Sequence, residues 1–164
     1  MPLRWKLFRA LCIVQMIAAA GNLLERLFSF FQYPSWGAVI SLLVYTAILL
    51  LSILAINLLN NNYPDEPVEG TQKRSFNRLF LVNFLLLACL FGFIISEYRS
   101  LQKIAALVRL DLFALPPGVF VMLAVHVFVL ILQLILLYGL YQLRVELYTN
   151  FTKRKFEFEK TAER

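Results

Sequence analysis

Four stretches of the sequence are apolar for long enough to cross a lipid bilayer. They cover about residues 7–31, 36–59, 79–96 and 117–141, and a membrane-crossing helix needs about 20 mostly apolar residues. We therefore predict an all-α protein, an integral membrane four-helix bundle, with residues 1–164 forming one four-span domain.

The first stretch allows a second interpretation. Basic residues precede a short apolar segment that ends in Ala18-Ala19-Ala20, a pattern that also suits a signal peptide and its cleavage site. However, the apolar pattern resumes after Asn22 and, apart from Glu25 and Arg26, continues to Phe31. We expect this segment to be retained as a permanent membrane helix, with Glu25 and Arg26 near the edge of the bilayer.

The connections between the stretches follow from their turn residues. Pro34 and Gly37 separate the first two helices, and prolines, Gly70 and polar residues predict a loop over 60–78. Between the third and fourth spans, apolar positions recur at helical spacing over 99–115, with basic and polar residues on the opposite face. This pattern predicts a short amphipathic helix lying at the outer interface, or equally an extension of the third helix.

Composition and charge agree with a membrane protein. The chain is 60% hydrophobic and only 16% charged, whereas a soluble domain has about 25% charged residues. The net charge of +6 does not indicate nucleic acid, because the basic residues flank the apolar stretches. Twelve of the 16 Lys and Arg residues fall on one side of the predicted topology. The positive-inside rule then places both termini and the 60–78 loop in the cytoplasm. We expect the protein to lie in the cell (inner) membrane.

Polar residues within the apolar stretches recur seven or fourteen positions apart (Gln15 and Asn22, His126 and Gln133, Asn83 and Glu97), which places each pair on or near one face of a helix. The four predicted helix-packing residues are Gln15, Asn22, Asn83 and Gln133. Because lipid provides no hydrophobic force between helices, such stripes are typical of helices that hydrogen-bond to each other.

Ionisable residues at membrane depth are candidates for function. The predicted outer polar cluster comprises Glu25, Arg26, Glu97, Arg99 and His126. Two bridges between the first and third helices satisfy these charges, either Glu25 to Arg99 or Arg26 to Glu97. His126 is the only histidine and we expect it to be structural, with a proton relay as the alternative. A zinc site needs three or four ligands, so we predict no metal site. We also predict no catalytic residues and no cofactor.

The segment 142–164 predicts a basic cytoplasmic tail that continues the fourth helix. Lys153, Arg154 and Lys155 lie beside Phe156 and Phe158, a combination suited to contact with anionic lipid. The alternative is a solvated tail whose charge reflects the topology alone.

No nucleotide-binding, metalloprotease or serine-hydrolase motif occurs in the sequence. The sequence therefore favours a non-enzymatic subunit or scaffold, paired with itself or with a larger membrane protein. The first alternative is an oligomeric small transporter or channel that uses the outer polar cluster. The second is a membrane enzyme that acts on a lipophilic substrate. A water-accessible cavity lined by the cluster would favour either alternative, whereas dry, paired groups would favour the scaffold.

Overall fold

The computed structural model describes residues 1–64 and 70–162, and within this part every long element is helical. Four long helices follow one another: α1 (Leu3–Gln32), α2 (Trp36–Asn62), α3 (Gly70–Val108) and α4 (Val121–Ala162). Two short 3₁₀ turns, η1 (Leu112–Ala114) and η2 (Pro117–Phe120), join α3 to α4. All four long helices are long and apolar enough to cross a membrane.

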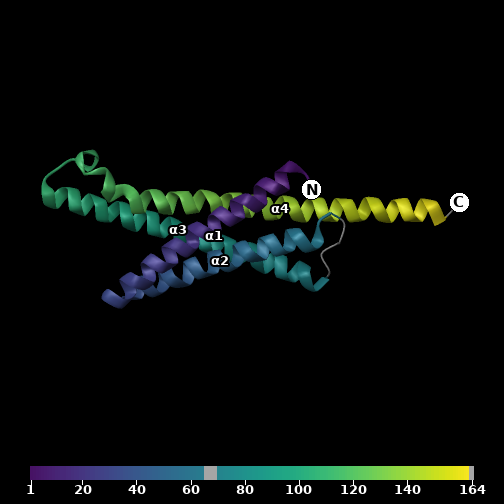
Figure 1. Cartoon of the computed structure of the whole chain (residues 1–164), viewed down its shortest axis with the longest axis horizontal. Coiled ribbons are helices and arrows are strands. Elements are labelled where there is room, and N and C mark those ends of the chain that lie inside the picture. The colour runs from purple at the N-terminus through teal and green to yellow at the C-terminus, as the bar shows by residue number, and fades with distance from the viewer. Residues whose placement is uncertain (65–69, 163–164) are drawn as a thin grey trace.

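Two helical hairpins make up the structure. α1 packs most extensively on α2, and α3 packs most extensively on α4, while any one helix of the first pair packs less extensively on any one helix of the second. We call α1–α2 the first hairpin and α3–α4 the second hairpin. The hairpins cross, and their tips lie apart at the left of Figure 1. We call this end the tip end and the opposite end, where the N-terminus lies, the terminal end.

Helix boundaries explain where the sequence prediction differs from the structure. A helix long and apolar enough to cross a membrane forms over each of the four predicted stretches, but α3 begins at Gly70, inside the expected 60–78 loop. Beyond Ser96, α3 continues without a break to Val108. Of the two structures expected for 99–115, the extension of the third helix therefore forms, and not a separate amphipathic helix. The chain leaves this helix at Arg109, whose φ of 55° places it in the left-handed region that ends a helix.

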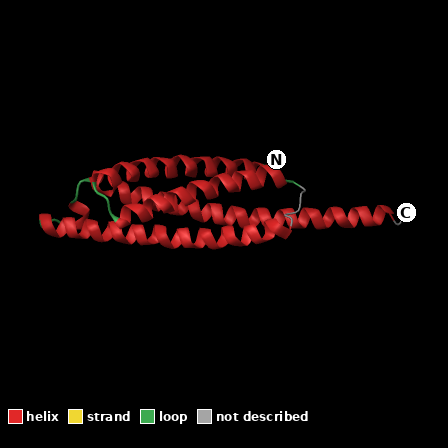
Figure 2. Ribbon diagram, turned by 90° about the horizontal axis from the view of Figure 1, so that it is seen from below, coloured by secondary structure: helices red, strands yellow, loops and turns green. Residues whose placement is uncertain are grey.

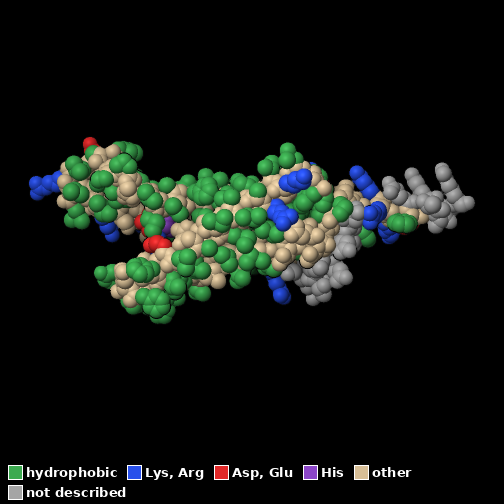
Figure 3. All heavy atoms as spheres, viewed as in Figure 1, with side chains coloured by type: hydrophobic (Ala, Val, Ile, Leu, Met, Phe, Trp, Pro, Cys, Tyr) green, Lys and Arg blue, Asp and Glu red, His purple; other side chains and the backbone are tan. Residues whose placement is uncertain are grey.

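Apolar side chains fill the terminal half of the core. The buried apolar residues of α4 recur every three or four positions and end at Leu147; they are Val129, Leu132, Leu136, Leu140, Leu143 and Leu147. All of them except Leu132 belong to one buried cluster that also contains Phe76 of α3 and Leu59 of α2. Many other large apolar side chains are exposed, and apolar side chains cover most of the face that Figure 3 shows.

α4 extends well past the other helices at the terminal end (Figures 1 and 2). This continuation of the fourth helix was expected from the sequence. Among the described residues after Leu147 none is buried, and Lys153, Arg154 and Lys155 are exposed. We call residues 148–162 the α4 arm.

Candidate functional site

A cleft opens between the two hairpins at the tip end. It has a volume of about 430 Å³, and all four helices contribute to its wall. The residues that line it are Arg26, Ser29, Tyr33, Ser35, Gly37, Ala38, Ser41, Phe93, Ser96, Glu97 and His126. In the space-filling view, acidic and histidine side chains are visible at the base of the notch between the two tips (Figure 3). Ligand pockets in proteins have volumes of about 300–1,000 Å³.

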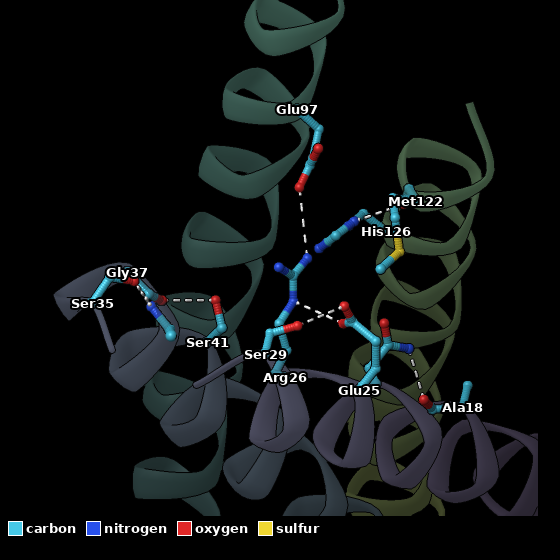
Figure 4. Close-up of polar contacts among 12 residues, drawn as sticks. Ala18, Glu25, Arg26, Ser29, Ser35, Gly37, Ser41, Glu97, Met122 and His126 are labelled. Carbon is cyan, nitrogen blue, oxygen red and sulfur yellow. Dashed lines mark hydrogen bonds and ion pairs between the residues drawn. The ribbon is translucent and has the colours of Figure 1, made fainter. Parts of the chain in front are cut away.

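Arg26 is the centre of charge at this cleft. Its Nε lies 3.2 Å from a carboxylate oxygen of Glu25, and its terminal nitrogen lies 3.6 Å from Oε1 of Glu97. Figure 4 shows the guanidinium extending from α1 toward Glu97 on α3. Nε has no partner in hydrogen-bonding geometry despite its burial. Arg26 is therefore held by charge alone, between one carboxylate of its own helix and one of the other hairpin.

The two expected bridges have different outcomes. Arg26 and Glu97 do form an ion pair between α1 and α3. Glu25 instead pairs with Arg26 and accepts a hydrogen bond of 3.2 Å from Ser29. Arg99 is exposed and does not line the cleft. Residues two apart on a helix are about 200° apart around its axis, so Arg99 and Glu97 point to different sides of α3.

His126 lies at the floor of the cleft. It is 1% exposed, and its Nδ1 lies 2.7 Å from the carbonyl oxygen of Met122 one turn earlier. A carbonyl oxygen only accepts, so Nδ1 carries the proton in this contact. In Figure 4 the far edge of this ring points toward the Arg26 guanidinium.

The ring of His126 packs against two aromatic rings, those of Phe93 and Tyr45. The histidine ring lies 5.8 Å from that of Phe93, in an edge-to-face arrangement, and 6.2 Å from that of Tyr45. Tyr45 and Phe93 stack on each other with centroids 6.4 Å apart. Because Tyr45 is fully buried, this layer separates the cleft from the deeper core.

A second polar level lies deeper, below the ring layer. Gln133 of α4 accepts a hydrogen bond from Gln15 of α1 and donates one of 3.2 Å to Asn83 of α3. All three side chains are at most 1% exposed. Asn22 bonds within α1, to the carbonyl of Ala18 at 2.8 Å. Three of the four predicted helix-packing residues thus link three helices, and the fourth remains within its own helix.

A third polar level lies at the terminal end and was not foreseen from the sequence. Glu146 of α4 accepts hydrogen bonds of 3.1 Å from the Trp5 indole and from the Tyr63 hydroxyl, and pairs with Arg4 at 2.8 Å. Burial, together with the Glu146 hydrogen bond, raises the pKa of the Tyr63 phenol. The sequence pattern groups Glu146 with the solvated tail, because its partners come from distant parts of the chain.

Comparison with known proteins adds nothing to these observations. No protein-family model, no curated protein and no solved structure matches this chain. The site must therefore be judged by its own chemistry.

Metal chemistry finds no support in the part of the chain that the structure describes, since it contains no group of three or more His, Cys, Asp or Glu side chains placed to hold a metal ion. The residues that sequence reasoning missed at the cleft are Ser29, Tyr33, Ser35 and Phe93. Serine and tyrosine are ordinary residues near helix ends, and phenylalanine is ordinary within an apolar helix; only the arrangement of the two hairpins brings these residues to one cleft.

Proposed function

We propose that this protein is a small membrane carrier that binds a solute in the cleft between its two hairpins. The observation that supports this best is the cleft itself, because three residues of the predicted outer cluster, Arg26, Glu97 and His126, line a cavity of about 430 Å³. Ionisable groups are costly at membrane depth, and within membrane spans they mark substrate and ion pathways.

The distribution of polar contacts between the hairpins also fits a carrier. The hairpins are joined at three levels: by Arg26 and Glu97 at the tip end, by Gln15 and Gln133 below the rings, and by Glu146 at the terminal end. The cleft of about 430 Å³ opens at the first level, while hydrogen bonds between the hairpins hold the other two levels together. A carrier that rocks one half against the other needs a site between the halves that is open on one side at a time.

We also propose an orientation and a location. The basic residues at the terminal end, including Arg4, Lys6 and Arg144, would place that end on the cytoplasmic side by the positive-inside rule. The cleft would then open away from the cytoplasm, in the cell (inner) membrane of its host, and the lipid bilayer would cover the outward apolar surface.

Aqueous access to the cleft tests the proposal. In a Cys12→Ala/Cys89→Ala background, Ser96→Cys should react with a charged, membrane-impermeant thiol reagent added to the outside of intact cells. Phe91→Cys lies on the same helix with its side chain on the exposed apolar face, and it should remain unreactive because lipid covers it. Ser52→Cys, fully buried between helices, is the second control. If Ser96→Cys reacts with the thiol reagent as little as Phe91→Cys does, the proposed carrier function is refuted.

A scaffold or subunit role is the second candidate, and the α4 arm favours it. The arm extends beyond the other helices (Figure 1) and exposes Phe156 and Phe158. Aromatic side chains on such a helix suit a second copy or a larger membrane protein. Contact of Lys153, Arg154 and Lys155 with anionic lipid remains a prediction that belongs to this role. Cross-linking in membranes from Phe156→Cys, with loss of the complex when 153–162 are removed, would support it.

A further inference from the structure

We propose that the cleft takes a small organic cation, an ammonium compound carrying an apolar group. This inference rests on the proposed carrier function, because it names the class of solute for the same site. It follows from three properties of the cleft: its net charge, the balance of its acceptors and donors, and its aromatic wall.

The charge of the cluster is negative. Two carboxylates, Glu25 and Glu97, surround one guanidinium, that of Arg26, which leaves a net charge of −1 on these three side chains. A further anion would bring a third negative charge close to these two carboxylates, whereas a cation would neutralise the excess negative charge. Charge therefore selects against carboxylate and phosphate ligands, although an arginine is present.

The distances show which carboxylate is available. Arg26 lies closer to Glu25, at 3.2 Å, than to Glu97, at 3.6 Å. Glu25 does not line the cleft, but Glu97 does. A bound ammonium can therefore pair with Glu97 while Arg26 retains Glu25. All four charges then have an opposite partner, which neither the empty cleft nor an anion-bound cleft achieves.

Hydrogen-bonding capacity points the same way. Four serines line the cleft, and three of them already use their hydroxyls: Ser29 donates to Glu25, Ser41 donates to the Gly37 carbonyl, and Ser35 accepts from the Ala38 amide. A hydroxyl that donates to a protein group still offers its lone pairs to a ligand. Ser29 and Ser41 are therefore acceptors toward the cleft, which suits the N–H groups of an ammonium.

Aromatic rings complete the site. Tyr33 follows the end of α1 with 79% of its surface exposed, and Phe93 lines the cleft from α3. A cation over the face of such a ring is attracted by the ring quadrupole. The same rings and the apolar wall between them suit the carbon skeleton of the ligand. Carboxylate, hydroxyl oxygens and aromatic rings together form the environment of an amine site.

Binding of three probes of matched shape tests the inference. Full-length protein in lipid nanodiscs is titrated with phenethylammonium, 3-phenylpropanol and 3-phenylpropionate, and empty nanodiscs provide the background. We expect phenethylammonium to bind at least tenfold more tightly than either of the others. Glu97→Gln should lower its affinity at least tenfold, whereas Glu159→Gln on the exposed end of α4 should leave it unchanged.

A second variant keeps the test valid if Glu97→Gln does not fold. Tyr33 is so exposed that Tyr33→Leu should fold normally, and loss of its ring should weaken cation binding about two- to fivefold. Tighter binding of 3-phenylpropionate than of phenethylammonium, abolished by Arg26→Gln, would refute the proposal of a cationic ligand but not the proposed carrier function. If none of the three probes binds, the proposal of a cationic ligand is also refuted. An unreactive Ser96→Cys would instead refute the proposed carrier function.

Discussion

The ring of Phe8 occupies the space in which any residue other than glycine at position 139 would place its Cβ. A Cβ built on Gly139 would lie 2.1 Å from Cε2 and 2.3 Å from Cδ2 of Phe8. The contact joins α1 to α4 between the Gln15–Gln133 level and the Glu146 level. Small residues at such positions allow two helix backbones to approach closely.

Gly139→Ala should destabilise the protein by about 1–3 kcal/mol, because Phe8 must leave a packed position beside Trp5. Thermal unfolding in detergent measures this. Gly92→Ala is the matched control, since a Cβ there would have no neighbour within 4 Å. We expect Gly92→Ala to be neutral or stabilising, because alanine favours a helix more than glycine does. Equal unfolding midpoints for the two variants would contradict the close contact.

Gln133→Leu should lower the free energy of unfolding by about 0.6–1.7 kcal/mol for each interhelical hydrogen bond that it removes. It leaves the amides of Gln15 and Asn83 buried without their partner. A double-mutant cycle with Gln15→Leu in detergent should show a coupling energy of this size. Asn22→Leu is the comparison, because Asn22 bonds only within its own helix and should show no coupling to Gln133. Additive effects of Gln15→Leu and Gln133→Leu would refute the link.

Glu146→Ala should destabilise the protein far more than Arg4→Gln. Arg4 has 67% of its side chain exposed, and ion pairs of exposed residues contribute about 0–1 kcal/mol. Loss of the carboxylate also deprives the Trp5 indole and the Tyr63 hydroxyl of their acceptor, and an unsatisfied buried donor costs about 1–3 kcal/mol. Thermal unfolding of the two variants compares them directly, and equal losses would show that the ion pair dominates this level.

The stabilising effect of the Tyr63 hydroxyl should disappear at high pH. Its pKa is raised in the folded protein, so its contribution is complete below the unfolded pKa of about 10 and is lost as the pH rises through the folded value. The difference in unfolding midpoint between the wild type and Tyr63→Phe, measured from pH 7 to pH 11, should fall toward zero only at the alkaline end. A constant difference across this range would contradict the hydrogen bond to Glu146.

Some of this site could be predicted from the sequence because a membrane simplifies the problem. A polar residue in an apolar stretch has to face other helices, so the sequence alone identifies Gln15, Asn83 and Gln133 as contact residues. The Arg26–Glu97 pair followed from equal depth on two helices. Both inferences need only the helical repeat and the length of each span.

Other features depend on three-dimensional relationships that no local pattern contains. Glu146 resembles any charged residue of a basic tail, and its role depends on Trp5 and Tyr63, which are 141 and 83 residues away. The cleft depends on the angle at which two hairpins cross. The start of α3 at Gly70 overrides the loop-forming tendency of its own residues, since about ten turns of helix follow it.

The straight course of α4 has a consequence for whatever acts beside the membrane. At about 1.5 Å per residue, the α4 arm carries its end roughly 20 Å past the last buried residue of the core. The headgroup layer on one side of a bilayer is only about 7 Å thick. In the proposed orientation the arm would therefore extend past the headgroup layer, and its last turns would stand at a fixed height above the membrane surface, where the part of a partner protein that projects from the membrane meets them.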